Sequence, residues 1–371
     1  MGLRAVHISD THLGFGAYNR VDPVQGINQR EMDFYDAFER AIDKVVRLEP
    51  DMVIHSGDLF DTVRPQNRAI DFALKQLIRL SEQGIETVMI SGNHSTPRLR
   101  ETGNIFRIFD HLDHVHPVYE AGIEKIEVGD VLVHAVPHST NPSLDQVVAD
   151  VAASEEHGCN VLVLHAGISG SSYRMDEFNE QSVSRELLPD EFDYIALGHY
   201  HKFSEVMGNA YYSGSTERHS FSELGQSKGF LEVDLGSGKV KFHDIAVREM
   251  VELEAVDASD MNASDIAALA KDRMDGSDLE GRIVRMAIRN IAPLAARALD
   301  VTSIKRLGSD AMHFELKVER TANGDSDSIA DSNIGSLAQE YQRFVDDLDL
   351  TAEDKERILE LGIEYFTEEG K

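Results

Sequence analysis

The feature that most constrains this chain is a series of histidine, aspartate and asparagine groups, each at or just after the end of a short apolar run. The groups are Asp10-Thr11-His12, Gly57-Asp58-Leu59-Phe60-Asp61, Gly92-Asn93-His94, His165 and Gly198-His199-Tyr200-His201. The apolar runs are rich in valine and isoleucine, which is typical of buried strands. Because ligands bind beyond the carboxyl ends of strands in open α/β sheets, we expect the five groups to meet in one crevice.

Amphipathic helical stretches separate the apolar runs, which predicts an α/β fold with helices covering a mostly parallel or mixed sheet. The strand-like runs occupy residues 3–9, 52–55, 87–91, 131–136, 161–165 and 194–197. Representative helices are expected over 31–48 and 67–83, and Gly84 suits the C′ position after the second. Later runs at 211–213, 229–234 and 239–245 are separated by Gly and Ser turns, so antiparallel strands should complete a sandwich. We therefore place a first module at 1–246.

The rest of the chain predicts three smaller parts. Residues 247–320 alternate strand-like stretches (250–256, 282–288, 312–319) with helical ones (263–274, 293–299), as in a compact β-α-β-α-β unit. Residues 321–333 have the Ser-, Asp-, Asn- and Gly-rich composition of a linker. Residues 334–371 contain two helical segments, 336–346 and 352–366, which predict a helical hairpin. The hairpin either packs on its own chain or docks on a partner.

The residue types in the five groups suit divalent metal ions. Imidazole, carboxylate and amide oxygen ligands admit manganese, iron, zinc or cobalt, and a single cysteine, Cys159, excludes a thiolate cage. Seven side chains are candidate metal ligands: Asp10, His12, Asp58, Asn93, His165, His199 and His201. Seven exceeds the four ligands of a closed structural site, so two ions bridged by Asp58 fit the set better than one.

A pair of ions roughly 3.5–4 Å apart suits phosphoester hydrolysis, because it activates water and clamps the phosphate oxygens. The leaving oxygen needs a proton, and His94, next to the candidate ligand Asn93, is the predicted general acid. Asp61 is predicted to hydrogen-bond His94 and to orient its ring. We interpret His55, on the strand before Asp58, as a candidate support behind the ligands. The remaining histidines, among them His111, His114, His116, His134 and His138, are interpreted as packing or surface residues.

The charge balance bears on the substrate and on the surroundings of the protein. The chain has 66 acidic and 36 basic residues and a net charge of −30, whereas nucleic-acid-binding proteins usually carry basic patches. The acidic residues are spread along the whole chain, which is typical of a halophilic protein in a salt-rich cytoplasm, where about 1 M salt screens charge within about 3 Å. A strand-like run at the very start and the lack of a roughly 20-residue apolar span predict a cytoplasmic protein without membrane contact.

In this order the motifs DxH, GDxxD, GNH, H and GHxH resemble the calcineurin-like metallophosphoesterase superfamily across residues 5–217. The flanking segments resemble the archaeal Mre-eleven and bacterial SbcD nucleases of DNA double-strand-break repair: DTHLGFGAYN (10–19), REMDFYDAF (30–38), HSGDLFDTVRP (55–65), ALGHYHK (196–202) and YSGSTE (212–217). This resemblance implies a metallophosphoesterase β-sandwich flanked by helices. It also implies that 247–320 is a small α+β capping domain over DNA and that 334–371 docks on an ATPase. Two residues depart from the family pattern, Asp61 where many members carry histidine and Ser95 where an acidic residue is common.

The resemblance further implies two manganese ions with separate ligand sets. One set is Asp10, His12, Asp58 and His201, and the other is Asp58, Asn93, His165 and His199. The family acts as a manganese-dependent 3′-to-5′ exonuclease on double-stranded DNA and a single-strand endonuclease, forms a homodimer, and works with a coiled-coil ATPase of the SbcC or Rad-fifty type. Arg64, Arg98 and Lys202 lie beside ligand motifs and are candidate contacts to the DNA backbone. Two other interpretations stay open: a phosphatase or small-molecule phosphodiesterase of the same superfamily, and a DNA-end-binding scaffold with little catalysis.

Overall fold

The computed structural model of this chain describes residues 3–97, 103–169, 181–320 and Val345. Met1–Arg320 forms one unit. The predicted linker at 321–333 lies outside the described residues, and so does the predicted hairpin at 334–371 apart from Val345. Both parts therefore stay predictions. Among the described helices none is long and apolar enough to cross a membrane.

Two mixed six-stranded sheets make up most of this unit. The first has the order β14-β13-β1-β2-β3-β4, in which β1 to β4 are parallel and β13 and β14 are antiparallel additions at one edge. Its strands are β1 (Arg4–Ile8), β2 (Met52–His55), β3 (Glu86–Ile90), β4 (Val115–Val118), β13 (Gly229–Asp234) and β14 (Lys239–Asp244). All carboxyl ends of β1 to β4 therefore point to the same edge of the sheet.

The second sheet repeats this plan with the order β11-β12-β10-β7-β6-β5. Strands β12, β10, β7 and β6 are parallel, and the two outer strands are antiparallel to their neighbours. Its strands are β5 (Glu124–Val128), β6 (Val131–Val136), β7 (Cys159–His165), β10 (Tyr194–Gly198), β11 (Ser204–Met207) and β12 (Ala210–Tyr212). A short parallel pair, β8 (Gly167–Ser169) and β9 (Ser182–Ser184), lies beside it. The two large sheets share a core that includes Ile54 and Val88 of the first and Val133, Val163 and Ala196 of the second.

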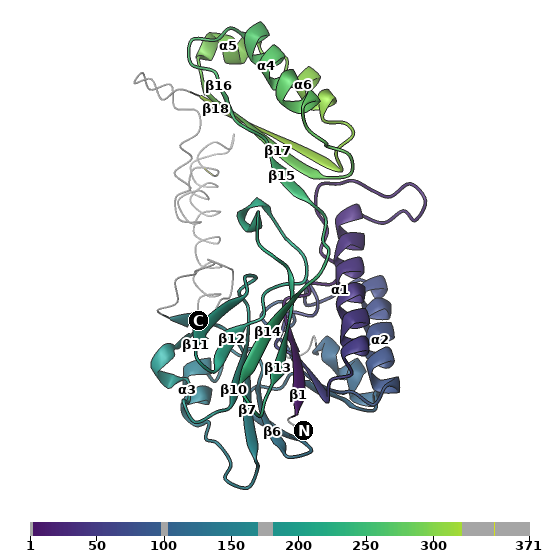
Figure 1. Cartoon of the computed structure of the whole chain (residues 1–371), viewed down its shortest axis with the longest axis vertical. Helices are drawn as coiled ribbons and strands as arrows, with labels where there is room; N and C mark the ends of the chain where they lie inside the picture. The colour runs from purple at the N-terminus through teal and green to yellow at the C-terminus, as the bar shows by residue number, and fades with distance from the viewer. Residues whose placement is uncertain (1–2, 98–102, 170–180, 321–344, 346–371) are drawn as a thin grey trace. The chain divides into compact units, whose positions relative to one another are not determined.

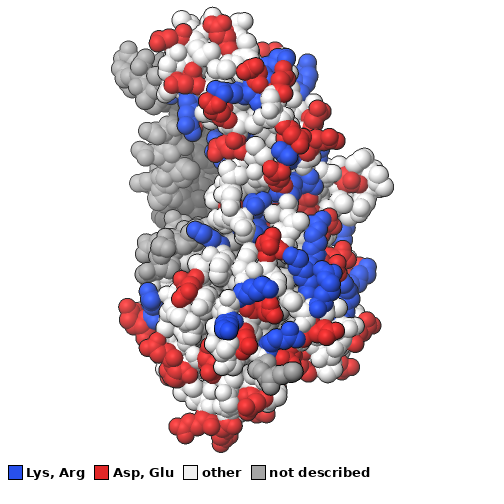
Figure 2. Space-filling model, viewed as in Figure 1, with Lys and Arg blue, Asp and Glu red and all other residues white. Residues whose placement is uncertain are grey.

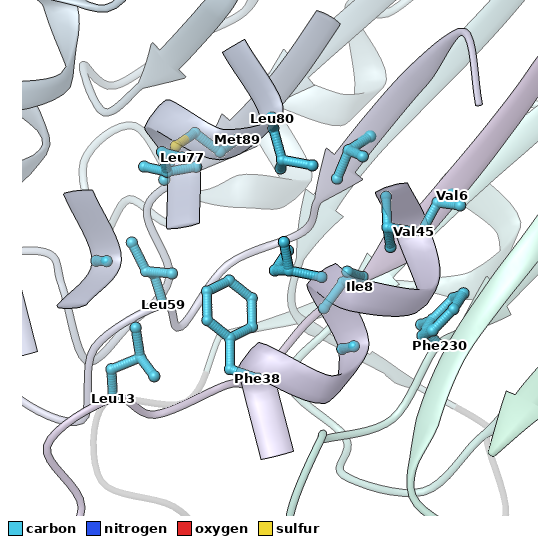
Figure 3. Packing of buried hydrophobic residues seen from close by; sticks show 14 of the residues in the cluster. Val6, Ile8, Leu13, Phe38, Val45, Leu59, Leu77, Leu80, Met89 and Phe230 are labelled. Atoms are coloured by element: carbon cyan, nitrogen blue, oxygen red, sulfur yellow. The ribbon is translucent and has the colours of Figure 1, made fainter. Parts of the chain in front are cut away.

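Helices α1 (Gln29–Leu48) and α2 (Asn67–Glu82) lie together on one side of the first sheet (Figure 1). Asn28 caps α1 because its side chain accepts hydrogen bonds from the first backbone N–H groups of the helix. Gly84 follows the C-cap of α2 with a φ of +69°, so the predicted C′ glycine is confirmed. Figure 3 shows how the apolar faces of both helices pack on the sheet through Phe38, Val45, Leu77, Leu80, Val6, Ile8 and Met89.

The second sheet is covered by α3 (Leu144–Ala149) and the short 3₁₀ helix η3 (Arg185–Leu187), whose apolar residues join the cluster that includes Leu162, Leu164 and Ile195. Two further 3₁₀ helices are η2 (Ile105–His111) and η4 (Phe221–Glu223). Helical layers thus lie outside a sheet-on-sheet core, and this arrangement leaves the strand ends as the place for a site.

Residues 250–320 build a separate four-stranded sheet in which the other three strands all pair parallel with β17. Its elements are β15 (Met250–Glu252), β16 (Val256–Asp257), α4 (Ala263–Asp275), β17 (Ile283–Ile291), α5 (Pro293–Ala298), α6 (Val301–Leu307) and β18 (His313–Arg320). The three helices pack on this sheet around their own core, which includes Ile266, Ala270, Val284, Met286 and Ile304. The boundary at residues 246 and 247 stays a prediction.

The predicted α/β sandwich is confirmed, but two strand predictions were wrong. Residues 250–256 form two strands, because the four-residue step from Glu252 to Val256 faces a three-residue step on β17, and the extra residue interrupts the ladder. Strand β12 was expected to be antiparallel in the sandwich; it is antiparallel to β11 but pairs parallel with β10. The unpredicted strand β11 reverses the chain before β12, and this reversal gives β12 the direction of β10.

Candidate metal centre

All seven predicted ligands lie at the carboxyl ends of parallel strands from the two large sheets. They follow or end β1 (Asp10, His12), β2 (Asp58), β3 (Asn93), β7 (His165) and β10 (His199, His201). Backbone hydrogen bonds hold the first two segments together: the Asp10 N–H donates to the Gly57 carbonyl and the His12 N–H to the Asp58 carbonyl, both at 3.0 Å. The structure therefore brings distant stretches of the sequence to one place, as the strand-end argument predicted.

The backbone at these positions is strained. Asp10, His12, Asp58 and His199 have φ values of +51°, +41°, +54° and +104°, in the left-handed region that few residues other than glycine adopt. Such conformations cost roughly 1–3 kcal/mol each and persist where the surrounding structure requires them. Their concentration at the strand ends supports these segments as the candidate functional site.

Two glycines let the segments approach more closely than any side chain permits. A Cβ atom on Gly57 would lie 2.2 Å from His165 Nδ1, and one on Gly92 would lie 2.2 Å from Asp58 Oδ1. Gly57 also has a φ of +106°. The motif glycines thus make room for the imidazole and carboxylate groups behind which they lie.

Asp58 lies at the centre of the predicted ligands. Its Oδ2 atom is 3.1 Å from His165 Nε2 and 3.9 Å from His12 Nε2, and its Oδ1 accepts the backbone N–H of His94 at 3.0 Å. Asn93 Oδ1 lies 2.9 Å from the same His165 nitrogen. Ligand atoms of Asp10, Asp58 and His165 lie within 4.8 Å of one another, as do those of His12, Asp58 and His94. Asp58 is common to both groups, as a bridging ligand would be.

The donor atoms fit divalent cations. His12 is 1% exposed, and neither of its ring nitrogens has a hydrogen-bond partner within the described part of the chain. A buried polar atom without a partner is costly, and a metal ion would satisfy it. Asp10, which accepts the His199 N–H at 3.0 and 3.1 Å, and Asp58 supply the negative charge. This oxygen and imidazole set suits manganese, iron or zinc.

The electrostatics of the centre favour positive charge. Burial raises the pKa of Asp58, but His165 opposes this effect and holds that pKa well below its usual range. Burial likewise lowers the pKa of His165, and Asp58 outweighs burial and raises the pKa to about 9. The carboxylates that stabilise a charged imidazole also stabilise a divalent cation at this position.

A second layer of groups orients the imidazoles. His165 Nδ1 donates to the Ser56 carbonyl at 2.8 Å, so Nε2 faces Asp58 and Asn93. His55 Nε2 lies 3.2 Å from the Thr11 hydroxyl, and burial lowers the pKa of His55 to about 4. His55 is therefore a neutral, buried residue in contact with Thr11, and its role as a support behind the ligands stays a prediction.

His94 and Asp61 lie beside this centre, and their contact differs from the expected one. His94 Nδ1 donates to the backbone carbonyl of Asp61 at 2.7 Å, whereas Asp61 Oδ1 lies 3.4 Å from His12 Nδ1. The His94 and His12 rings meet edge to face with centroids 4.8 Å apart. Residue 61 thus orients the His94 ring through its main chain, and the Asp61 carboxylate faces a predicted ligand.

Two residues of the site were missed by the sequence reasoning. His219 has its ring centroid 4.5 Å from that of His12 and 4.2 Å from that of His201, and the ligand atoms of these three histidines lie within 4.8 Å of one another. Glu223 accepts a hydrogen bond from His201 Nδ1 at 2.8 Å. Both residues lie in the segment after β12 that includes η4, so no strand end marked them.

The remaining candidates divide by location. Arg64 and Lys202 are exposed, and Arg98 lies outside the described residues. His114 and His116 bind Glu86 at 2.7 and 2.8 Å, apart from the centre. Acidic side chains lie over the described part of the face shown in Figure 2 from top to bottom, whereas basic side chains gather mainly on its right side.

Comparison with known proteins gives a consistent set of similarities. The family model of the calcineurin-like phosphoesterases matches residues 3–203. The chain is 30% identical over 275 residues to the DNA double-strand break repair protein Mre11 of Methanocaldococcus jannaschii, covering 70% of this chain and 69% of that protein. It is 33% identical over 270 residues to the protein of the same name from Thermoplasma acidophilum, with coverage of 67% and 68%. A third, from Sulfolobus acidocaldarius, is 23% identical over the full length of both chains.

Proposed function

This chain belongs to the calcineurin-like phosphoesterase family and is a metal-dependent phosphodiesterase, and we propose that its substrate is DNA at double-strand breaks. The proposal is supported by the names of its relatives and by the seven ligand-type side chains that both sheets present at their strand ends, among which Asp10, His12 and His165 lie close to Asp58. Clustering of groups able to hold a bridged pair of ions is the observation that carries hydrolysis, and the names of the relatives support DNA as the substrate. A scaffold that only binds DNA ends has no need of such a set.

In the proposed centre, Asp10, His12, Asp58 and His201 would hold one ion, and Asp58, Asn93, His165 and His199 would hold the other. Two bound ions supply an activated water and neutralise the charge that develops on the phosphate. The protein residues fix the positions: the Ser56 carbonyl directs His165 Nε2 toward Asp58, and the His94 N–H directs Asp58 Oδ1. We propose manganese as the native metal, since oxygen and imidazole ligands without thiolate suit it.

His94 is the proposed general acid. Its Nδ1 is held by the Asp61 carbonyl, so a proton given to a leaving oxygen comes from Nε2 on the other side of the ring. The backbone N–H of the same residue binds the bridging carboxylate at 3.0 Å. Acid and proposed bridge are therefore held in one rigid geometry. Asp61, with its carboxylate near His12, is proposed to orient the acid through its backbone.

We further propose 3′-to-5′ exonuclease activity on double-stranded DNA and endonuclease activity on single strands. Residues 247–320 are proposed as the capping domain over the DNA, and the exposed Arg64 and Lys202, with Arg98, as contacts to its backbone. The protein is proposed to form a homodimer and to work with a coiled-coil ATPase of the SbcC or Rad-fifty type, which residues 334–371 would bind. The dispersed acidic surface favours a salt-rich cytoplasm as its location.

Cleavage of end-labelled duplex DNA in molar salt with manganese tests the proposal. Asp58→Ala is expected to lose both metal and cleavage, because the shared carboxylate disappears. His94→Ala is expected to keep metal and to lose about 10²- to 10⁴-fold in turnover, the usual contribution of a general acid. Wild-type protein that binds metal and hydrolyses nucleotides, but leaves every DNA substrate intact, would contradict the DNA assignment in favour of a small-molecule phosphodiesterase.

A further inference from the structure

A buried charged pair lies behind His201 and is not part of the ligand set. Glu223 Oε1 accepts a hydrogen bond from His201 Nδ1 at 2.8 Å, and its Oε2 lies 2.7 Å from Lys228 Nζ. The side chains of all three residues are at most 3% exposed. Glutamate and lysine side chains are almost never fully buried in proteins unless each charge has a partner.

Lys228 binds the same histidine from the other side. Its Nζ donates to the His201 carbonyl and to the Ser215 hydroxyl, each at 2.8 Å, in addition to the ion pair with Glu223. The ammonium group is thus held by four oxygen atoms, the fourth being Gln226 Oε1 at 3.3 Å. The carboxylate is held by His201, by Lys228 and by the His219 N–H at 3.2 Å. Both charges are fully engaged, so the pair has a fixed geometry.

We propose that Glu223 is a positioning residue for His201 and strengthens it as a metal donor, while the Lys228 ammonium limits that effect. The inference rests on the proposed metal centre, in which His201 is a ligand. A carboxylate on Nδ1 selects the tautomer whose proton lies on Nδ1, and Nε2 is then the donor atom. Negative charge on Nδ1 makes Nε2 more basic, and loss of such a partner typically costs 10- to 100-fold in metal affinity.

Glu223 also affects the neighbouring histidine. The His219 ring lies 4.2 Å from the His201 ring, and its Nδ1 is 3.8 Å from Glu223 Oε1. The carboxylate thus hydrogen-bonds the ring of His201 and the backbone of His219, and both rings lie against His12. It therefore acts on the proposed ion bound by His12 rather than on the one bound by His165.

Metal titration of the full-length protein separates this role from a merely structural one. Glu223→Gln and Lys228→Met break the same buried ion pair, so a purely structural pair predicts the same loss from both. A positioning carboxylate predicts different results, since only Glu223→Gln removes the negative charge that is hydrogen-bonded to His201. Glu232→Gln is the matched control, because Glu232 binds His243 Nε2 at 2.7 Å on β13 and β14, away from the centre.

Binding of manganese alone is measured by calorimetry in molar salt, with paramagnetic resonance to distinguish paired from single ions. Wild type and Glu232→Gln are expected to bind two ions and to show a coupled pair. Glu223→Gln is expected to lose 10- to 100-fold of its manganese affinity in one of the two binding steps. At limiting manganese it should therefore show single ions instead of a coupled pair. Lys228→Met is expected to bind both ions at least as tightly as wild type.

Two results would overturn the inference: unchanged binding in Glu223→Gln, or equal weakening in Glu223→Gln and Lys228→Met. Thermal unfolding of each metal-free variant shows whether it is folded. If a single change unfolds the chain, the double variant Glu223→Gln with Lys228→Met replaces it, because removing both charges leaves no unpaired buried charge. The double variant should show the same loss of manganese affinity in one binding step as is expected for Glu223→Gln. No DNA enters these assays, so a wild type that binds two ions but cleaves no DNA would refute the nuclease alone.

Discussion

Replacing Asp33 on α1 should destabilise the chain more than replacing its partner Arg248, although both changes remove the same ion pair. Arg248 holds Asp33 through two hydrogen bonds, Nε to Oδ2 at 2.7 Å and Nη2 to Oδ1 at 2.6 Å. Arg30, which is 0% exposed, also donates to Asp33 Oδ2, at 2.6 Å. Asp33→Ala therefore deprives two guanidinium groups of this carboxylate, whereas Arg248→Ala leaves Asp33 paired with Arg30.

The size of the difference follows from burial. Removal of one partner from a buried ion pair costs roughly 3–5 kcal/mol. Asp33→Ala should fall in this range because, among the described residues, Arg30 keeps only Glu217, at 3.7 Å, as a nearby carboxylate. The Arg248 side chain is 24% exposed, so its loss should cost about 1.5–3 kcal/mol, as for hydrogen bonds to charged groups. We expect a difference of about 2 kcal/mol in the free energy of unfolding.

Urea denaturation in molar salt measures both losses. Asp71→Ala is the control, since Asp71 and Lys75 form a solvent-exposed pair at 2.6 Å whose removal should change stability by about 0.5 kcal/mol or less. Equal losses for Asp33→Ala and Arg248→Ala would show that only the shared pair counts, and would refute the argument from the buried Arg30.

Two further predictions concern the site and the pH dependence of stability. Gly57→Ala should lose roughly 1–3 kcal/mol and weaken manganese binding, because φ is +106° and the new Cβ would lie 2.2 Å from His165 Nδ1. Calorimetry against Gly84→Ala, where φ is +69° but no atom lies within 4 Å, isolates the contact; equal metal affinities would contradict it. Burial raises the pKa of Glu86, but hydrogen bonds from His116 and His114 outweigh this effect and lower that pKa below 4.5. The ionised Glu86 therefore stabilises the folded chain above its unfolded pKa, and this stabilisation is lost as the pH falls below 4.5. Glu86→Gln should reduce the fall in the free energy of unfolding at acidic pH by less than about 1 kcal/mol. An unchanged fall, measured by urea denaturation, would refute this prediction.

The ligand cluster could be predicted because its information is local. Each group directly follows a β-branched run, and parallel strands bring their carboxyl ends to one edge whatever lies between them. Asp58 and His165, 107 positions apart in the printed sequence, therefore meet at 3.1 Å. The prediction did not need the exact sheet order, only the direction of the strands.

The parts that could not be predicted depend on tertiary packing. Strand β11 has intermediate and exposed positions rather than an apolar run, so its pattern does not separate it from a loop. The bulge between β15 and β16 depends on register with β17, which no single segment encodes. The contact from residue 61 to His94 runs through a backbone carbonyl, and a search for side-chain partners does not find such a contact.

The segment after β12 shows why the support of a metal centre is harder to find than its ligands. Glu223 holds His201, and six residues earlier Glu217 Oε1 lies 3.7 Å from Arg30 Nη2 of α1. Ligands must lie within reach of the ions, which confines them to strand ends, whereas supporting groups need only reach a ligand's far nitrogen. Any buried segment can meet that weaker requirement. A charge replaced in this segment is therefore expected to alter metal affinity and stability together, and only paired variants such as Glu223→Gln and Lys228→Met separate the two.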